Sequence, residues 1–456
     1  MSRQRAPITP PVVLTIAGSD SGGGAGIQAD LKTIEAGGAF GTSAITSVTA
    51  QNTRGVEGTH RLPLEEIEAQ YDAVISDFDV AAVKTGMLAT SEVVEFVTDA
   101  IAEMDVPAVV DPVMVAASGD RLLDKDAEAA YEDLAREAAL ITPNADEAEV
   151  LTDTTIETVA DAQQAGEQLV DEGVEAALIK GGHLDSEDVA DVLVTEAGIE
   201  TITHQRVDTE ATHGSGCTLS AAIATRLAYG DNLSTAVRTG IDLLGRAVRY
   251  SLDVGQGPGS VHHMVAVRDR ANREPTAEQV SGIVRAFVDM DVSALVPEVG
   301  MNVVGATPYA EAPRECAAVE GRISRTLDGV EPTGGVRFGA SSHVARFLLG
   351  AREFEADFRY AVNCRYDEDI ESALAYLSWP VASYDRSEEP ETIKTTDGAT
   401  MDWAGRQAFG GDQTPVAVTD PGDHGKEPMT KVLAADPTTL VKRVETLLDV
   451  LGENGE

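Results

Sequence analysis

The sequence predicts an α/β protein in which a mainly parallel sheet sandwiched by helices is followed by a second, mixed α/β domain. From Val12 to about Leu252, short apolar runs bounded by Gly, Pro or Asn alternate with longer helical patterns, which is typical of consecutive βαβ units. With 456 residues, the chain is also too long for one ordinary hydrophobic core. We therefore expect two domains.

Six short apolar runs predict the strands of the first domain. They cover residues 12–17, 44–50, 79–86, 106–112, 139–144 and 176–182. Between them, segments such as 65–77 and 91–104 repeat apolar residues at the spacing of one helix face. This alternation predicts helices packed against the faces of the sheet.

A charged stretch around Pro275 separates the two domains in this prediction. The βαβ alternation weakens beyond residue 261, where charged residues become frequent. We expect the first domain over 1–268, a linker over 269–275 and the second domain over 276–456. The second domain begins with a helical pattern at 277–290 and closes on another at 438–452.

The chain is strongly acidic, with a formal net charge of −43. It contains 8 lysines and 26 arginines, and its acidic residues are spread along the whole length. This composition favours a protein adapted to high salt, where screening relieves self-repulsion, and an ordinary acidic protein is the alternative. In both cases we expect no nucleic-acid partner, because the chain has no basic patch to release counterions.

Cysteine usage and hydropathy indicate a cytoplasmic protein. Cys217, Cys316 and Cys364 form no CxxC pair, so we expect neither a disulfide framework nor a zinc site. The apolar run at 12–17 is too short for a signal peptide and has no cleavage site. No apolar segment reaches the roughly 18 residues of a membrane span, so we expect no membrane contact.

The stretch at 15–33, TIAGSDSGGGAGIQADLKT, joins an apolar strand to a helix through a cluster of glycines. It has neither the GxxxxGK[ST] pattern of a P-loop nor GxGxxG in register for a dinucleotide site. Consecutive glycines nevertheless tolerate positive φ and let the backbone approach a ligand. The residues alone leave both a sharp turn and a ligand site open.

A second glycine site precedes a long Ala-rich helix. Gly214, Ser215 and Gly216 stand before Cys217, where free N–H groups and the positive end of the helix dipole converge. Such a nest suits a transferring phosphoryl group. The helix start should lower the pKa of Cys217 and make it a thiolate base, and a small buried thiol is the alternative.

Four polar residues fall at predicted strand ends, where open α/β sheets bind ligands: Asp111, Asn144, Glu147 and Lys180. Because lysine is scarce in this chain, Lys180 is a candidate contact to a nucleotide phosphate. Asp111 and Glu147 are candidates to hold Mg²⁺ directly or through water. Helix capping or solvation is the alternative for each residue singly, but together they indicate phosphoryl transfer.

These segments together resemble one enzyme family. The motifs TIAGSDSGGGAGIQADLKT, AQNTRGV, KTGML, DPVM, TPNADEAE, KGGH, HGSGCTLSAA and GPGSVHH follow the order and spacing of the hydroxymethylpyrimidine/phosphomethylpyrimidine kinases of the ribokinase-like superfamily. The resemblance covers about residues 11–265 and implies a ribokinase-like fold. It also implies that ATP, with Mg²⁺, phosphorylates the hydroxymethyl group of the pyrimidine half of thiamine and then the resulting phosphate.

The resemblance implies a role for each matching residue. Gln51 should hydrogen-bond the aminopyrimidine, and Cys217 should take the position of the catalytic base. The other implied residues are Gly18, Asp30, Met87 and Val113 around the pyrimidine, and Lys180, Asn144 and Glu147 for ATP and Mg²⁺. Ser215 stands where Thr is more usual, which keeps the backbone donors. Substrate range stays open, since related kinases phosphorylate pyridoxal-type alcohols.

The second domain carries arginines close to glycines and other small residues. The segments EGRISRTLDG and GGVRFGASSHVARFLLGA contain Arg322, Arg325, Arg337, His343 and Arg346. In so acidic a chain, this pattern indicates an anionic ligand such as pyrophosphate. Surface arginines paired with acidic residues are the alternative.

This region resembles the ThiN-type thiamine-phosphate synthase domain, on the motifs MNVVGATPYA, GGVRFGASSHVARFLL, VNCRY and DPGDHGKEPM. The resemblance implies that the domain joins hydroxymethylpyrimidine pyrophosphate to hydroxyethylthiazole phosphate and releases pyrophosphate, a leaving group that cations stabilise. It implies that Arg322 binds the pyrophosphate and that His343 contacts phosphate or passes a proton. Asn302, Arg337 and Asp423 are further candidates for ligand or metal contact.

Three other functions remain open from the sequence. The second domain could sense a thiamine precursor or product without catalysis, although the presence of Arg322 and His343 argues against this. A DNA-binding regulator would need a basic recognition helix, which the sequence lacks. The third alternative is a kinase that phosphorylates pyridoxal, but the motif AQNTRG favours the pyrimidine as the substrate. We expect small-molecule substrates and a homodimer or higher homo-oligomer.

Overall fold

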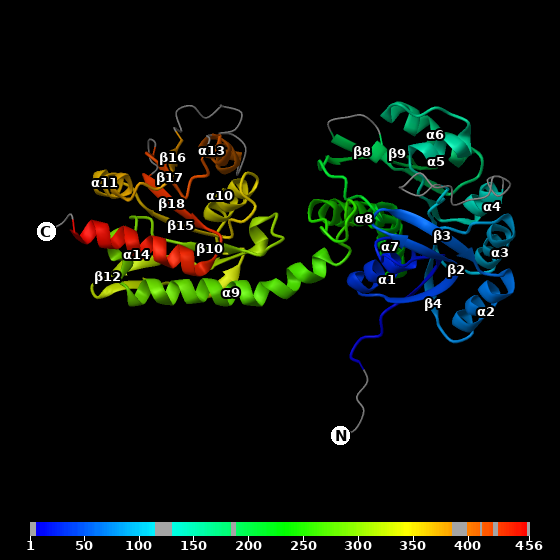
Figure 1. Cartoon of the computed structure of the whole chain (residues 1–456), viewed down its shortest axis with the longest axis horizontal. Coiled ribbons are helices and arrows are strands. Elements are labelled where there is room, and N and C mark those ends of the chain that lie inside the picture. The colour runs from blue at the N-terminus through cyan, green and yellow to red at the C-terminus, as the bar shows by residue number, and fades with distance from the viewer. Residues whose placement is uncertain are drawn as a thin grey trace, which may run out of the picture. The chain divides into compact units, whose positions relative to one another are not determined.

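The computed structural model of the chain describes residues 6–114, 130–183, 188–384, 399–410, 413–422 and 427–453. The chain divides into two compact units, of which the first ends at Ala266 and the second begins at Val267 (Figure 1). Each unit contains one large sheet with helices packed on its two faces. The predicted α/β class with a second α/β domain is confirmed.

The segment at 269–275, expected as a linker, is helical instead. It lies within α9 (Val265–Asp289), which contains Pro275 in its interior. A proline inside a helix removes a hydrogen bond and costs about 3 kcal/mol. Helix α9 forms despite this cost because its later turns bury Val280, Ile283 and Phe287 in the core of the second unit.

The sheet of the first unit contains nine strands within the described residues, in the order β3-β2-β1-β4-β5-β6-β7-β8-β9. Strands β1, β2 and β4 to β7 pair in parallel, whereas β3, β8 and β9 pair antiparallel. The mainly parallel sheet is therefore confirmed, and each of the six predicted runs contains a strand. The strands are β1 (Val12–Asp20), β2 (Phe40–Asn52), β3 (Gly55–Arg61), β4 (Val80–Thr85), β5 (Ala108–Val110), β6 (Leu140–Ile141), β7 (Ala176–Ile179), β8 (Asp188–Thr195) and β9 (Gly198–Gln205).

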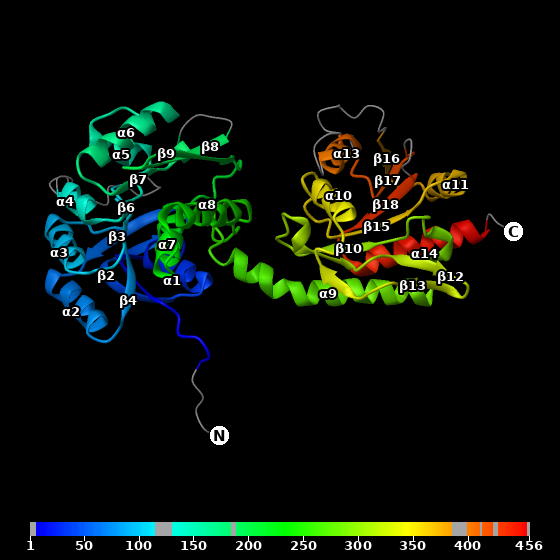
Figure 2. The same cartoon turned by 180° about the vertical axis from the view of Figure 1, so that it is seen from behind.

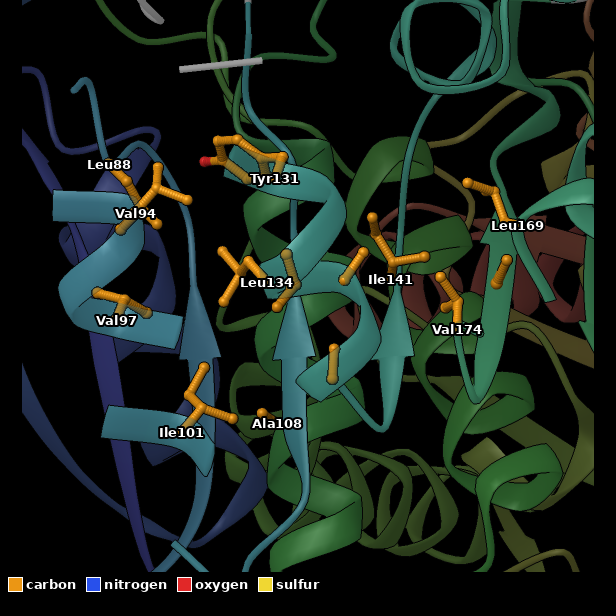
Figure 3. Close-up of a cluster of buried hydrophobic side chains, with 14 of the residues drawn as sticks. Leu88, Val94, Val97, Ile101, Ala108, Tyr131, Leu134, Ile141, Leu169 and Val174 are labelled. Atoms are coloured by element: carbon orange, nitrogen blue, oxygen red, sulfur yellow. The ribbon is translucent and has the colours of Figure 1, made fainter. Parts of the chain in front are cut away.

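Helices cover both faces of this sheet, as Figure 1 and Figure 2 show. On one face α1, α7 and α8 pack against alternate strand residues such as Val13 and Val109. On the other, α2 to α6 pack against the residues between them, and Figure 3 shows Val97, Ile101 and Leu134 in this core. The helices are α1 (Gly26–Gly37), α2 (Leu64–Ile75), α3 (Ser91–Ala102), α4 (Ala130–Glu137), α5 (Ala145–Thr152), α6 (Val159–Asp171), α7 (Ser215–Ala228) and α8 (Leu233–Arg249).

The parallel strands place their carboxyl ends along one edge of the sheet. Strand β1 ends at Asp20, β4 at Thr85, β5 at Val110, β6 at Ile141 and β7 at Ile179. Open α/β sheets bind their ligands at this edge. The residues that follow these strands are therefore brought close together although they are far apart in the sequence.

The second unit is built on a seven-stranded sheet within the described residues, in the order β14-β11-β10-β15-β18-β17-β16. Its pairs are antiparallel except for β16 with β17. Helices α9, α11 and α14 pack on one face, and α10 and α13 pack on the other, as both views in Figure 1 and Figure 2 show for α9, α10, α13 and α14. Strands β12 and β13 form a separate hairpin.

The elements of the second unit after α9 have the following bounds: β10 (Val303–Ala306), β11 (Cys316–Val319), β12 (Ile323–Thr326), β13 (Gly329–Pro332), β14 (Val336–Phe338), α10 (His343–Arg352), β15 (Tyr360–Arg365), α11 (Glu368–Leu377), β16 (Val381–Ser383), α13 (Ala399–Phe409), β17 (Ala417–Asp420), β18 (Met429–Ala434) and α14 (Pro437–Glu453). Among the described helices, none combines the length and the apolar character that a membrane span requires.

Candidate active sites

The glycine stretch after β1 folds around the carboxylate of Asp20. The backbone N–H groups of Gly22, Gly24 and Ala25 donate to this carboxylate at 2.7, 2.9 and 2.7 Å. The N–H of Gly23 donates to the Asp20 carbonyl oxygen at 2.9 Å. Because these donors are used inside the loop, the loop is a turn around a buried anion and does not offer them to a phosphate.

Asp20 also ties this loop to His213, the residue before the second glycine site. Nε2 of His213 lies 3.1 Å from Oδ2 of Asp20 and 3.5 Å from Nε2 of Gln51. Burial alone would raise the pKa of Asp20, but hydrogen bonds from His213, Ala25 and Gly22 outweigh it and hold the pKa below its ordinary value. Gln51 thus lies at the end of β2, beside the loop.

Helix α7 begins at the second glycine site. Gly214 precedes the helix with a φ of 84°, and a Cβ there would lie 1.8 Å from the carbonyl oxygen of Gly24, so only glycine fits. The N–H of Ser215 donates to the Thr212 carbonyl at 3.0 Å. Of the expected nest, the N–H of Gly216 is a first-turn donor that has no partner within the helix.

Gly216 brings the start of α7 next to two of the predicted strand-end residues. A Cβ at Gly216 would lie 3.3 Å from both Oδ2 of Asp111 and Nζ of Lys180. Nζ of Lys180 in turn lies 3.0 Å from Oδ1 of Asp111 and 3.7 Å from Oε2 of Glu147. The fold therefore brings the expected phosphate-binding and metal-binding residues to one point.

Asn144 and Glu147 form a capping box at the start of α5. Oδ1 of Asn144 accepts from the Glu147 N–H at 2.8 Å, and Oε2 of Glu147 accepts from the Asn144 N–H at 2.8 Å. The capping role is thus present, and it fixes the carboxylate of Glu147 toward Lys180. Burial raises the pKa of Glu147, Lys180 lowers it, and the nearby Asp111 carboxylate raises it further.

The donor set at this point suits Mg²⁺. No cluster of three or more His, Cys, Asp or Glu side chains in the described ranges forms a metal cage. Mg²⁺, however, is usually held by one or two carboxylates together with substrate phosphates and waters. Asp111 and Glu147 supply two carboxylates beside the start of a helix, which fits this mode of binding.

Cys217 lies in the first turn of α7, as expected, but its pKa differs from the expectation. Burial raises the pKa of the thiol to about 11, although the Lys84 ammonium opposes this. The nearby carboxylates of Asp30 and Asp111 contribute to this rise. The predicted lowering by the helix start is therefore wrong, because desolvation and two nearby carboxylates outweigh the dipole, and the thiol is protonated at neutral pH.

Asp30, expected at the wall of the pyrimidine pocket, is fully buried in an ion pair with Lys84. Both side chains are 0% exposed, and Nζ of Lys84 lies 2.9 Å from each carboxylate oxygen. Thr15 Oγ1 also donates to Asp30 at 2.7 Å. Burial raises the pKa of Asp30 against the effect of Lys84. For Lys84 burial lowers the pKa, but the charges of Asp30, Cys217 and Asp111 and the hydrogen bond to Asp30 together outweigh burial and raise it. The pair thus holds a cation near Cys217.

Three further expected pocket residues lie at the same sheet edge. Gly18 and Met87 touch so closely that a Cβ at Gly18 would lie 2.3 Å from Cε of Met87. Met87 follows β4 and is buried, and Val113 follows β5 and is half-buried. Their positions near the ends of β1, β4 and β5 are compatible with the expected pocket, which stays a prediction.

A cavity of about 80 Å³ lies beside the glycine loop, lined by residues that include Gly24, Thr53 and His263. Nε2 of His263 lies 3.1 Å from the carbonyl oxygen of Gly24. Burial lowers the pKa of His263 to about 4, so the imidazole is neutral and accordingly adds no charge to the cavity. Small-molecule sites measure about 300–1,000 Å³, so this cavity is only part of a site.

Sequence reasoning assigned no role to Asp20, Lys84 or His213. All three lie within the quoted motifs, and the scarcity of lysine that drew attention to Lys180 applies equally to Lys84 in KTGML. Nothing in the sequence indicated a role for Asp20 or His213, because their contact joins two loops that are 193 positions apart in the chain.

In the second unit, Arg322 is held just before β12. Its backbone N–H donates to Thr333 Oγ1 at 2.8 Å, and its Nη1 donates to the Gly321 carbonyl at 2.7 Å. Gly300, with a φ of 86°, packs so closely that a Cβ there would lie 2.7 Å from Cβ of Arg322. The position of Arg322 therefore depends on these three neighbours.

Asn302, a predicted ligand contact, is buried and tied to the sheet. Its Nδ2 donates to the carbonyls of Val319 and Gly321 at 3.0 and 3.3 Å, and its Oδ1 accepts from the Val319 N–H at 3.1 Å. Both amide hydrogens are thus used by the backbone. The amide of Asn302 serves the sheet beside Arg322, and the structure gives no support to its expected ligand contact.

The remaining candidates of this unit are spread over separate elements. His343 is exposed at the first position of α10. Arg337 on β14 is exposed and lies 2.9 Å from Glu320, as in the surface ion pair that was the alternative. Asp423 lies outside the described residues.

A cavity of about 670 Å³ lies at the edge of the second sheet where β15 ends and β18 begins. Arg325, Arg365, Tyr366 and Glu427 are among its lining residues. Its size is that of a small-molecule site. Arg325 is one of the arginines that the sequence pattern singled out for an anionic ligand, whereas Arg322 and His343 do not line the cavity.

Chemically, the first unit combines a cation, two carboxylates and a helix N-terminus beside a cysteine. A helix N-terminus and a lysine bind phosphate, and carboxylates bind its metal ion. This combination supports transfer of a phosphoryl group to an acceptor near Cys217. The second unit offers an arginine and an exposed histidine, which support binding of an anion.

Comparison with known families agrees with this division. Residues 20–262 match the family model described as phosphomethylpyrimidine kinase. Residues 279–446 match the model described as thiamine-phosphate synthase ThiN. The resemblances expected from the motifs are confirmed for both units.

Individual relatives match the first unit. The hydroxymethylpyrimidine/phosphomethylpyrimidine kinase of Streptomyces coelicolor is 46% identical over 264 residues, which cover 58% of this chain and 98% of that protein. The thiamine biosynthesis bifunctional protein ThiED of Geobacter sulfurreducens is 43% identical over 272 residues, which cover 59% of this chain and 56% of that protein. Among solved structures, Bacillus subtilis pyridoxal kinase in an ADP complex matches with a TM-score of 0.54 and 34% identity, covering 57% of this chain and 99% of that one.

Proposed function

The chain belongs to the phosphomethylpyrimidine kinase family and also carries a ThiN-type thiamine-phosphate synthase domain, and from this premise we propose that it makes thiamine phosphate by successive reactions. The first unit phosphorylates 4-amino-5-hydroxymethyl-2-methylpyrimidine to its phosphate and then to its pyrophosphate. The second unit couples this product to hydroxyethylthiazole phosphate. The observation that carries the proposal is the meeting of Gly216, Lys180, Asp111 and Glu147 beside Cys217.

In the kinase site, Lys180 and the start of α7 bind the phosphates of ATP. Lys180 lies between the carboxylates of Asp111 and Glu147, which raise its pKa and keep its ammonium charged beside Gly216. Asp111 and Glu147 would hold Mg²⁺, which when bound neutralises charge on the transferring phosphoryl group. The ADP complex of the similar pyridoxal kinase supports ATP as the phosphoryl donor.

Cys217 occupies the position of the base. Because its pKa is about 11, the thiol must lose its proton before it can accept one from the substrate hydroxyl. Lys84, buried against Asp30, is the charge that most favours this ionisation. We assign Lys84 to stabilising the thiolate of Cys217, and Gln51 to the aminopyrimidine.

A pyridoxal-type alcohol is the second candidate substrate, because the similar solved structure is a pyridoxal kinase. The two substrates differ in the groups that Gln51 would meet. Comparing kcat/KM for the hydroxymethylpyrimidine and for pyridoxal decides between them. A higher value for pyridoxal would replace the pyrimidine in the proposal.

One reaction tests the proposal as a whole. The full chain is incubated with ATP, Mg²⁺, hydroxymethylpyrimidine and thiazole phosphate in molar KCl, and the products are identified by mass spectrometry. We expect thiamine phosphate, and with His343→Ala we expect its loss and accumulation of the pyrimidine pyrophosphate. Lys442→Ala, which changes an exposed residue of α14, is the control. If wild type stops at the pyrimidine pyrophosphate, the second unit is a sensor.

Three broader properties belong to the same proposal. With a net charge of −43 the protein should need high salt, and full activity with unchanged melting in dilute buffer would contradict this. The free thiols of Cys217, Cys316 and Cys364 support a reducing cytoplasm, which localisation of the tagged chain tests. We also propose that the chain forms a homodimer or a higher homo-oligomer, and light scattering tests this.

A further inference from the structure

A row of buried polar side chains crosses the second sheet on the face that otherwise packs against α10 and α13. Asn363 stands opposite Lys431 in the register of β15 and β18, and Asn302 is joined to Asn363 by backbone and amide hydrogen bonds. Directly opposed residues of antiparallel strands point to the same face. Around this row, Val304, Ala361 and Leu433 form an apolar core.

At one end of the row, Asn302 and Asn363 fix the backbone next to Arg322. Nδ2 of Asn302 donates to the carbonyl of Gly321 at 3.3 Å, and Nδ2 of Asn363 donates to that of Gly300 at 3.2 Å. These are the two glycines that flank Arg322 in space. The polar row is therefore continuous with the residue expected to bind pyrophosphate.

At the other end, Lys431 is buried with Asp420 and Tyr384. The hydroxyl of Tyr384 donates to Asp420 at 2.7 Å, and Nζ of Lys431 lies 3.0 Å from this hydroxyl and 3.8 Å from the carboxylate. The exposed fractions are 4% for Lys431, 0% for Asp420 and 3% for Tyr384. Burial disfavours a charged lysine, and the neighbouring carboxylate opposes this effect.

The same cluster also lies close to His343. Nζ of Lys431 is 4.9 Å from the ring centroid of Phe347. Phe347 and His343 are four residues apart on α10, so they lie on one face of this helix, one turn apart. Lys431 therefore lies beneath α10, the helix that begins at His343.

Stability alone gives no reason for a buried lysine and aspartate in this core. Well-packed apolar residues in place of a buried ion pair are often as stable or more stable. Buried charged clusters of this kind are frequent at functional sites. The chain has 8 lysines, and one of them is buried beneath α10. This burial favours a functional role for Lys431.

We propose that Lys431, held by Asp420 and Tyr384, is an anion-binding residue of the synthase site and contacts the departing pyrophosphate together with Arg322. This inference rests on the proposed function of the second unit. In that reaction the bond between the pyrimidine methylene carbon and the pyrophosphate oxygen breaks, and its electron pair stays on the oxygen. The lone pair of the thiazole nitrogen forms the new C–N bond, so no proton is transferred. Arg322 offers a planar fork and Lys431 a point charge to the two phosphates.

The test uses the full chain and bypasses the kinase by supplying the pyrimidine pyrophosphate and thiazole phosphate without ATP. For Lys431→Met we expect the KM for the pyrimidine pyrophosphate and the inhibition constant of inorganic pyrophosphate to rise about tenfold or more, equivalent to at least about 1.4 kcal/mol. The KM for thiazole phosphate should stay unchanged. Lys431→Arg should restore part of the pyrophosphate affinity, because the charge is kept.

Two further variants keep the test decisive. Lys442→Met removes an exposed lysine of α14 and should leave all three constants unchanged. Tyr384→Phe keeps the ring and removes the hydroxyl that contacts Lys431, so it should weaken pyrophosphate inhibition, measured below the melting temperature of the variant. If Lys431→Met lowers only kcat, or raises the KM for thiazole phosphate instead, the proposal is wrong.

The outcome separates this inference from the proposed function. If the wild type forms no thiamine phosphate, the synthase assignment fails, but binding of inorganic pyrophosphate to the full chain remains measurable by calorimetry with the kinase site saturated by ADP. A roughly tenfold loss of this affinity in Lys431→Met then still supports the anion site. Equal affinity in wild type and variant overturns it.

Discussion

Replacing Lys84 by Met should destabilise the first unit by about 3–5 kcal/mol, the usual cost of removing one partner from a buried ion pair. Lys84 and Asp30 are both 0% exposed, and their charged atoms are 2.9 Å apart. With an effective dielectric constant of about 20, two charges at 2.9 Å attract by about 6 kcal/mol, which sets the upper limit. In the variant, the Thr15 hydroxyl still donates to the Asp30 carboxylate.

The assay is calorimetric unfolding of the full chain in high salt, following the transition of the first unit. Lys32→Met is the matched control, because Lys32 is an exposed lysine of α1 and its loss should cost less than about 1 kcal/mol. Adding Asp30→Asn to Lys84→Met should recover part of the lost stability, since the unpaired charge is then gone.

The pH dependence of this destabilisation follows from the directions in which the pKa values of Asp30 and Lys84 are shifted. Burial already raises the pKa of Asp30, and without Lys84 the pKa rises further, so the folded variant takes up a proton as the pH falls. The difference in stability between wild type and Lys84→Met should therefore shrink as the pH falls. The raised pKa of Lys84 means that its own contribution is complete below the ordinary lysine pKa and is lost as the pH rises beyond it. A destabilisation below about 1 kcal/mol, or one that does not change with pH, would refute the reasoning.

Three other variants test the placement of single residues. Gly214→Ala puts a Cβ 1.8 Å from the Gly24 carbonyl oxygen at a φ of 84°, so we expect about 1–3 kcal/mol of strain. The kinase rate should fall about tenfold or more, and the synthase activity should be kept. Normal kinase turnover would contradict this. Asn302→Leu removes hydrogen bonds that join β10 to β11, and unfolding of the second unit should become easier by about 1–3 kcal/mol, whereas unchanged melting would show that the amide is dispensable. Iodoacetamide should alkylate Cys217 slowly at neutral pH and faster toward pH 11, because burial keeps the thiol protonated. The label on Cys217 is identified by its absence in Cys217→Ser. Rapid labelling at pH 7 would show a thiolate and contradict this reasoning.

Much of the fold and of the kinase site could be predicted from the sequence because both depend on local patterns. Strand and helix periodicity gave the order of the elements, and motifs at strand ends placed Lys180, Asp111 and Glu147 at one edge. Parallel strands force their carboxyl ends together, so this prediction needed no side-chain contacts. The start of α7 at the second glycine site was also predicted, and binding of an anion there stays a prediction.

The predictions that differed from the structure concern burial and partners. The charged segment with Pro275 suggested a linker, but packing of the same helix on the second core decided its conformation. The pKa of Cys217 was misjudged because the local helix dipole is visible in sequence and desolvation is not. Asn302 and Arg337 were candidates by residue type, and only their neighbours identify them as a sheet contact and a surface ion pair.

The sequence by itself determined the two-domain α/β organisation, the family resemblances and the strand-end residues of the kinase, because these follow from spacing along the chain. Only the tertiary structure decided which charged and polar groups come into buried contact with one another. The pair of Asp30 with Lys84, the turn of glycines around Asp20, and the cluster of Lys431, Asp420 and Tyr384 each join distant segments. The strength of an ionic or hydrogen-bonding contact depends on distance and on the exclusion of water, and neither is specified until the chain is folded.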